Sequence, residues 1–251
     1  MKKIIYIIII LTLMTVGCSK ETLAPRTKDE TLKQLQQSIK AIDSLSSESE
    51  NKTTVIYNKF TTQFTQKTTS QTNTLDEFNL AVEADSNHSR YPVHSYRVYI
   101  KSGVLRADPD PSYLTYQARR ADTKYIEATI ADIFNLKHIV QGVIKPSADD
   151  VSIDEQAIHY KGTGAVMKEL FEYGLVSSSM NQIEPLSDLK DLTVTSGSYS
   201  IQYSPVKVYP KTLTFQVEVT ATIDEDPVMI KMEQTTDYYD FNKTKVTDLT
   251  E

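Results

Sequence analysis

The chain has 251 residues, with 27 basic and 33 acidic side chains and a formal net charge of −6. An acidic balance gives no electrostatic reason to bind nucleic acid, whose backbone attracts basic proteins. The length suits one domain or at most two small ones. The only cysteine is Cys18, so no disulfide can stabilise the core.

The first element is an apolar run over residues 4–14, which contains one threonine and follows Lys2 and Lys3. A basic start and an apolar run of this length are typical of a secretory signal, whereas a membrane-spanning helix needs roughly 17 to 25 apolar residues. The run ends in Thr-Val-Gly-Cys at residues 15–18, which resembles the bacterial lipobox. The resemblance implies cleavage before Cys18 and a diacylglyceryl group on its sulfur.

This start predicts the organisation of the whole chain. We expect a signal peptide over residues 1–17, the lipidated cysteine and a short linker over residues 18–27, and a single domain over residues 28–251. After cleavage the formal charge is −8, from 25 basic and 33 acidic residues. The expected location is the extracytoplasmic face of the cell membrane, held there by the diacylglyceryl-cysteine.

A helix is expected next, because Thr27 and Glu30 have the spacing of a capping box. Apolar residues at intervals of three and four make one buried stripe along it: Leu32, Leu35, Ile39 and Ile42. The Ser- and Glu-rich residues 44–50 are expected to end this helix.

Apolar and polar residues then alternate over residues 56–64, 78–84, 96–100 and 113–117, which predicts strands. In the first of these, Ile56, Phe60 and Phe64 are expected on one side of a Thr- and Gln-rich strand. Such alternation favours an antiparallel sheet with one wet face and one covered face.

Two helices are expected to interrupt the sheet, with a strand over residues 153–160 between them. The first runs over residues 129–145 and ends at Pro146, and the second begins near Thr163. The first carries too many apolar residues for a narrow stripe, so it must be buried on more than one side or face an apolar space.

The C-terminal part returns to strands. Residues 213–223 and 228–232 alternate around a turn at 224–227, which predicts a long hairpin, and residues 193–203 predict a neighbouring strand. The order of elements therefore predicts an α+β fold, with the helices on one face of one large antiparallel sheet.

Motifs for chemistry are lacking in the sequence. The four histidines, at positions 88, 94, 138 and 159, have no metal-ligand spacing, and neither H-E-x-x-H, C-x-x-C nor G-x-S-x-G occurs. Acidic pairs beside turns lack the alternating spacing of a calcium loop. We therefore expect no metal, no cofactor, no nucleic-acid partner and no enzymatic activity.

The lipobox, the short linker, one amphipathic helix, Thr-rich strands, a central helix pair and a closing hairpin together resemble LolA/LppX-like lipoproteins. The ending at residues 238–246, Tyr-Tyr-Asp-Phe-Asn-Lys-Thr-Lys-Val, is similar to that of their uncharacterised branch in Gram-positive bacteria. The resemblance implies a half-barrel: a strongly curved antiparallel sheet with helices packed across its concave face. It also implies a lipid or acyl chain held between sheet and helices.

On that resemblance, nine apolar residues line the ligand site: Ile133, Phe134, Val140, Met167, Leu170, Phe171, Phe215, Val217 and Val219. An ordinary dry core is the competing interpretation of the same pattern. Two functions therefore stay open. One is a lipoprotein that binds or carries a hydrophobic ligand, and the other is an envelope or host-interaction lipoprotein with a filled core, no small ligand and an unidentified protein partner.

Overall fold

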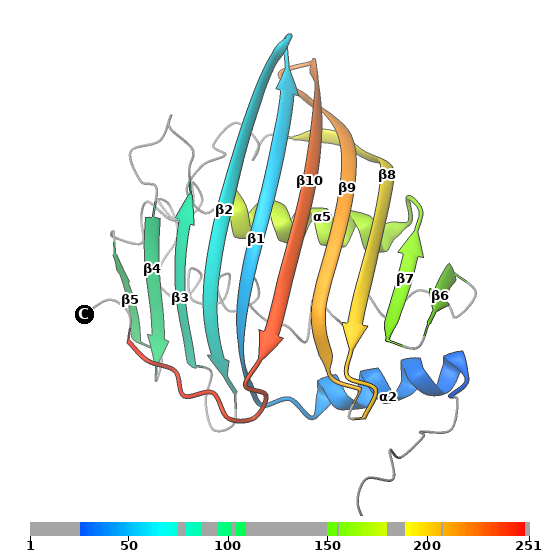
Figure 1. The fold of residues 1–251 in the computed structure, drawn as a ribbon. Coiled ribbons are helices and arrows are strands. Elements are labelled where there is room, and N and C mark those ends of the chain that lie inside the picture. Colours follow the sequence, from blue (N-terminus) through cyan, green and yellow to red (C-terminus); the bar gives the residue numbers. More distant parts are fainter. Residues whose placement is uncertain are drawn as a thin grey trace, which may run out of the picture.

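The computed structural model describes residues 26–74, 79–86, 95–101, 104–108, 150–154, 156–179, 189–206 and 208–248. Ten strands form one antiparallel sheet in the order β5-β4-β3-β2-β1-β10-β9-β8-β7-β6 (Figure 1). The sheet is open and curved, with β5 and β6 at its edges. Its centre joins β1 to β10, so strands from opposite ends of the chain pair there.

The strands are β1 (Ser44–Tyr57), β2 (Phe60–Asn73), β3 (Asn79–Ser86), β4 (Ser95–Lys101), β5 (Val104–Asp108), β6 (Val151–Ile153), β7 (Ala157–Lys161), β8 (Lys190–Tyr203), β9 (Pro210–Ile223) and β10 (Asp226–Tyr239). The described helices are α2 (Lys28–Lys40) and α5 (Ala165–Ser179). None of the helices in the described part of the chain is both long and apolar enough to cross a membrane.

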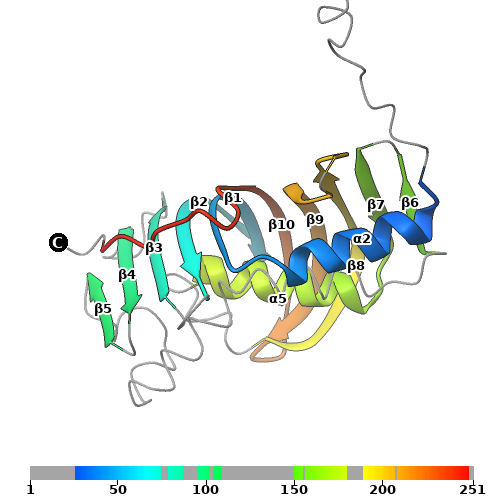
Figure 2. The same ribbon diagram turned by 90° about the horizontal axis from the view of Figure 1, so that it is seen from below.

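Helix α2 begins as the sequence predicts. The hydroxyl of Thr27 accepts from the backbone N–H of Glu30 at 3.3 Å, and the Glu30 carboxylate accepts from the backbone N–H of Thr27 at 2.8 Å. The bond from that N–H lowers the pKa of Glu30. Leu35 and Ile39 are buried, and seen from below α2 runs under the lower ends of strands β6 to β10 (Figure 2).

Residues 44–50 do not simply end the helix, as the sequence suggested, because β1 begins at Ser44. Strands β1 and β2 then meet at Asn58 and Lys59, whose φ angles of 47° and 69° fit a tight hairpin turn. The expected single strand over residues 56–64 is therefore two strands, and Ile56 and Phe64 lie on opposite faces. The strand expected over residues 153–160 is also a hairpin, since Asp154 turns the chain between β6 and β7.

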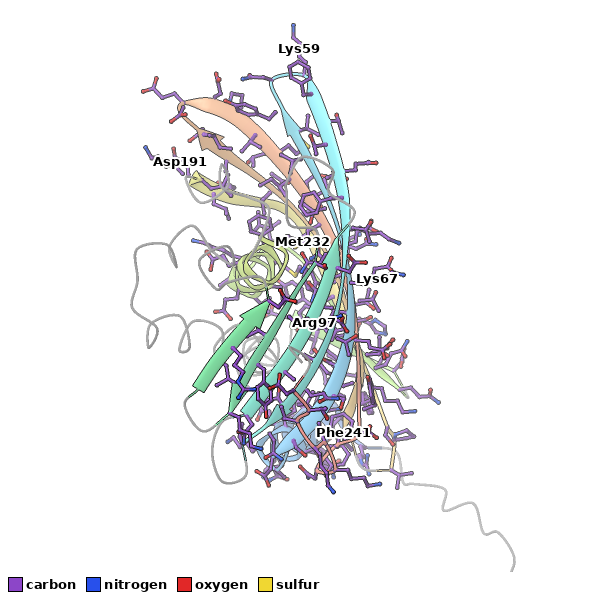
Figure 3. The ribbon with its side chains drawn as sticks, turned by 90° about the vertical axis from the view of Figure 1, so that its left-hand side faces the viewer. Lys59, Lys67, Arg97, Asp191, Met232 and Phe241 are labelled. Carbon is purple, nitrogen blue, oxygen red and sulfur yellow. The ribbon has the colours of Figure 1, made fainter. Side chains whose placement is uncertain are left out.

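The two faces of the sheet differ in what they carry. We call the face on which α5 lies the inner face and the opposite one the outer face. Figure 3 shows Met232 on the α5 side and Lys67 on the other. The predicted alternation over residues 213–223 and 228–232 is confirmed, since the alternate apolar residues of β9 and β10 are buried on the inner face.

The segment after β10 crosses the outer face at the lower ends of β1 to β5 (Figure 1). Asn242 fixes its start, because its side chain accepts from the backbone N–H of Asp43 at 2.7 Å and donates to the carbonyl of Ala41 at 3.1 Å. Further along, the Asp248 carboxylate pairs with the Arg106 guanidinium at 2.7 Å. The ending noted in the sequence thus ties the α2–β1 corner to the sheet.

Candidate ligand-binding face

Six of the predicted ligand-site residues lie in the described part of the chain, and all belong to one buried core. Met167, Leu170 and Phe171 come from α5, and Phe215, Val217 and Val219 come from β9; none is more than 3% exposed. The other three, Ile133, Phe134 and Val140, fall outside the described residues, as does Cys18. The structure therefore brings the two described groups together, helix against strand.

Helix α5 packs directly on the sheet where it crosses. A Cβ added at Gly197 of β8 would lie 2.7 Å from Met167 Cγ, so the absence of a side chain there makes room for Met167. A Cβ added at Gly174 would run into the sulfur of Met232 and lie 3.0 Å from Phe215 Cζ. Close packing of this kind leaves no space for a ligand at these contacts.

Beyond α5 the inner face stays apolar. The hairpins β1–β2 and β9–β10 rise well above the level at which α5 crosses (Figure 1). One row runs across four strands by register, from Val194 through Val219 and Ile230 to Val55. We call this row, together with Ala221, Ile223 and Val228, the upper inner face; its residues on β9 and β10 are at most 9% exposed.

Below that row the inner face becomes polar on β2, β1 and β10, whereas β9 stays apolar at Val217 and Phe215. Gln66, Asn51 and Gln234 lie side by side on β2, β1 and β10, and we call these three the amide row. They are 2%, 5% and 2% exposed, respectively. This row could not be predicted from the sequence, because an alternating polar residue is normally assigned to the wet face. Three amides at paired positions become visible only once the strand register is known.

Hydrogen bonds join the amide row to its neighbours. Asn51 Nδ2 donates to Gln234 Oε1 at 3.0 Å, and Thr53 Oγ1 donates to Asn51 Oδ1 at 2.7 Å. Gln234 Nε2 in turn donates to Thr236 Oγ1 at 3.2 Å. The result is an ordered, uncharged polar network within the covered side of the sheet.

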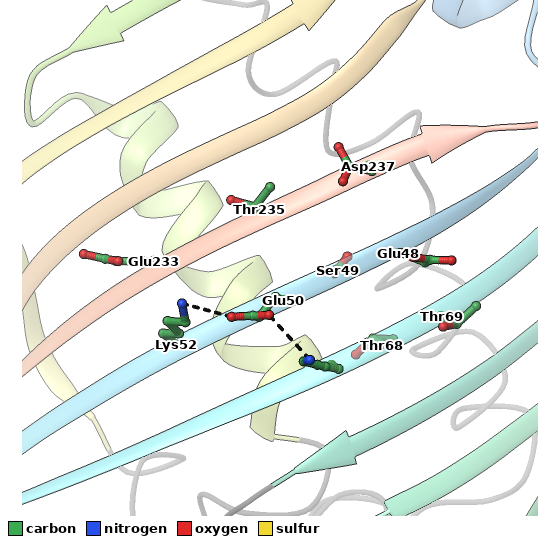
Figure 4. A pocket seen from close by; sticks show the side chains of 10 residues that line it. Glu48, Ser49, Glu50, Lys52, Thr68, Thr69, Glu233, Thr235 and Asp237 are labelled. Atoms are coloured by element: carbon green, nitrogen blue, oxygen red, sulfur yellow. Dashed lines mark ion pairs between the residues drawn. The ribbon is translucent and has the colours of Figure 1, made fainter.

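The outer face over β2, β1 and β10 carries a hollow of about 500 Å³ (Figure 4). Charged side chains line it: Glu48, Glu50, Lys52, Lys67, Glu233 and Asp237. Lys52 lies 2.9 Å from Glu50 and hydrogen-bonds it, which lowers the pKa of Glu50 and raises that of Lys52. This hollow is an open, solvated surface, unlike the inner face.

A group of three or more acidic, cysteine or histidine side chains placed to hold a metal ion is not found among the residues the structure describes. The chain matches no protein-family model and no curated protein.

A comparison with solved structures finds matches of low similarity. A DUF1329 family protein from Desulfovibrio piger is 9% identical, covering 89% of this chain and 96% of its own, with a TM-score of 0.28. Lipovitellin, described for its lipid–protein interactions, is 9% identical over 81% of this chain and 26% of its own, with a TM-score of 0.33. A LolA superfamily protein from Nitrosomonas europaea is 9% identical over 90% and 96%, with a TM-score of 0.18. LolA-like proteins are thus among the neighbours, but scores this low do not assign the chain to a family.

Proposed function

We propose that this chain is a lipoprotein, anchored by a lipidated Cys18 on the extracytoplasmic side of a membrane, that binds or carries a hydrophobic ligand. The ligand is a lipid or acyl chain lying on the upper inner face, in a half-barrel whose concave side is lined by helices. The protein acts by binding, without metal, cofactor or enzymatic step.

One observation carries the proposal: the buried apolar row continues past the helix that packs on it. Because α5 crosses the strands, it covers a band about 10–12 Å wide, the diameter of a helix with its side chains, whereas 14-residue strands are roughly 46 Å long (Figure 1). In the described part of the chain, α5 and α2 pack on the middle and lower end of the inner face (Figures 1 and 2). An acyl chain on the upper part would gain about 25 cal/mol for each Å² of its own apolar surface that is removed from water.

In the proposed site, residues of a predicted helix form the wall on the other side of the acyl chain. Ile133, Phe134 and Val140 fall in the apolar run that predicts a broad-faced helix. In our proposal they face the upper inner face across the ligand. Met167, Leu170 and Phe171 then form the floor that separates the ligand from the lower core.

The test is native mass spectrometry of the mature lipoprotein, extracted from its membrane in a mild non-ionic detergent. A discrete added mass, lost on denaturation and identified as a lipid, supports the proposal. A bare lipoprotein mass in several detergents would overturn it.

A filling substitution locates the site. Ala221→Phe adds a ring to the upper inner face, and we expect it to lower lipid occupancy at least about tenfold while the protein stays folded. Thr220→Phe, the next residue on the outer face, is the matched control and should leave occupancy unchanged. In a dry core, Ala221→Phe would instead cost about 1–3 kcal/mol of stability through overpacking.

A second function, an interaction lipoprotein with a filled core, is favoured by two other observations. Helix α5 packs tightly on the sheet at Gly174 and Gly197. At the tip of the β1–β2 hairpin, Phe60 is 73% exposed, which suits contact with another protein. A stoichiometric protein partner that is recovered from membranes and lost in Phe60→Ser would favour this function.

A further inference from the structure

We propose that the inner face also selects the chemistry of the ligand, because the amide row binds the uncharged polar head of an amphiphile whose apolar chain lies on the upper inner face. The inference rests on the proposed function and narrows it to one class of ligand. That class is an acyl chain joined to a neutral hydrogen-bonding head such as a glycerol ester.

The two zones adjoin at the same height on neighbouring strands. On β1 the inner face passes from Val55 through Thr53 to Asn51, and on β10 it passes from Ile230 through Met232 to Gln234. The register pairs each residue of one strand with its counterpart on the other. An amphiphile lying along β1, beside the contact of α5 with Met232 and Gln234, therefore meets an apolar side chain with one end and an amide with the other.

The amide row is not what an ordinary core needs. Replacing two buried hydrogen-bonding partners by apolar groups of similar shape is often neutral for stability or even favourable. Packing of the core therefore does not explain three amides that are at most 5% exposed. A primary amide offers two N–H donors, and the hydrogen bonds among the described residues use one donor of Asn51 and one of Gln234.

Gln234 and Asn51 have different roles in the proposed site. A Cβ at Gly174 would lie 3.3 Å from Gln234 Oε1, so α5 lies over Gln234. Gln234 is thus a positioning residue, which holds the Asn51 amide by accepting its bond. Asn51 lies one strand further from this contact, next to Gln66 on β2. Its second N–H takes no part in the hydrogen bonds among the described residues and is the donor offered to the ligand head.

Charge decides which head fits. The inner positions of β1 and β2, and those of β10 from Val228 to Tyr238, carry no Asp, Glu, Lys, Arg or His; Asp226 is acidic but lies exposed at the hairpin tip. The outer positions of the same strands carry the acidic and basic residues that line the hollow. A carboxylate or phosphate head on the inner face would be desolvated without a counter-ion. A neutral head avoids the cost of desolvating a charge and gains hydrogen bonds to the amides.

The experiment offers three ligands of equal chain length to the mature lipoprotein in one sample: palmitoylglycerol, palmitate and palmitoyl lysophosphatidate. Native mass spectrometry then measures the relative occupancy of each. We expect palmitoylglycerol to exceed either anionic ligand by about tenfold or more. Binding of all three to similar extents, or a preference for an anion, would overturn the inference and leave the proposed function standing. Binding of none would overturn the proposed function itself.

Two variants test the amide row directly. Asn51→Leu keeps the approximate shape but removes the amide. The ratio of palmitoylglycerol occupancy to that of either anionic ligand should therefore fall towards one, while the total occupancy by the three ligands is retained. Gln66→Met does the same at the neighbouring position, in case one variant folds poorly. Thr54→Leu, on the outer face of β1, is the matched control and should keep the preference. An unchanged preference in both amide variants would count against the row as the binding site.

Discussion

The inner and outer faces of β10 differ in how deeply their side chains are buried. On the inner face, Val228, Ile230 and Met232 are at most 2% exposed, and Gln234 and Thr236 are buried just as deeply, at 2% and 3%. On the outer face the intervening residues are mostly exposed, and they include Lys231, which pairs with Glu218 at 2.7 Å.

This comparison separates two properties that are usually treated as one. From Val228 to Tyr239 charge divides the faces of β10 cleanly, but polarity does not, because the inner face carries amides and hydroxyls as deeply buried as its aliphatic side chains. The outer face uses exposed ion pairs, which contribute little to stability. The inner face relies on packing and on directed hydrogen bonds between uncharged groups.

The largest expected effect comes from placing one charge on each face. Ile230→Lys puts an ammonium group at a position that is 0% exposed, and we expect the free energy of unfolding to fall by at least about 3 kcal/mol. Met229→Lys makes the same change one residue away on the outer face, with an expected effect within about 0.5 kcal/mol. Urea denaturation measures both, and equal losses would mean that the faces do not differ as described.

A smaller effect is expected at the closed contact under α5. Gly174→Ala should improve helix propensity by about 1 kcal/mol, but its methyl group would meet the sulfur of Met232. Overpacking costs about 1–3 kcal/mol, so the net result should be a loss of about 1 kcal/mol. Combining it with Met232→Val removes the clash, and a double-mutant cycle should show coupling of at least about 0.5 kcal/mol. Strict additivity would indicate space between helix and sheet.

The sequence predicted the parts of the fold in which period and polarity agree. The capping box at Thr27, the start of α5 near Thr163, and the β9–β10 hairpin all lie where the structure has them. In each of these, apolar residues mark the buried side. The large antiparallel sheet followed from the same alternation.

The predictions from sequence were wrong or incomplete where polar residues of the strands are buried. Residues 44–50 contain four serines and two glutamates among seven residues, which suggested only the end of the helix, yet Ser47 is 8% exposed in β1. Asn51 and Gln66 likewise gave no signal of burial. These residues are brought side by side by the register of the strands, which a single sequence does not reveal.

A further prediction concerns the hydrogen bonds that hold the C-terminal segment on the outer face. Asn242 has a φ of 58°, and its side chain bonds Asp43 and Ala41. Asn242→Gly keeps the backbone conformation and loses only these bonds, so we expect a cost of about 1 kcal/mol. Asn242→Ala adds strain at positive φ, for a total of about 2 kcal/mol. Thermal denaturation compares the two, and a Gly variant as stable as the parent would show that the bonds contribute nothing.

The smallest effect should come from an exposed charge at the β6–β7 turn. Asp154 accepts from the backbone N–H groups of Gln156 and Ala157 at 2.9 and 2.8 Å, and its other oxygen lies 3.0 Å from His159 Nε2. The backbone bond from Gln156, and then the His159 bond, lower the pKa of this carboxyl below its usual 3.8. A lowered folded-state pKa means that the stabilisation is complete above the unfolded pKa and disappears as the pH falls through the folded one.

Asp154→Asn should therefore lower the Tm slightly at pH 7, and the difference from the parent should close as the pH falls through the lowered pKa, where the parent carboxyl also becomes neutral. Because the backbone bond is the larger cause of the pKa shift, His159→Gln should reproduce only part of the loss. A Tm difference that stays constant from pH 7 to pH 3 would mean that shape, and not charge, matters at this turn. This small effect at an exposed carboxylate contrasts with the large loss expected when Ile230→Lys buries a charge without a partner.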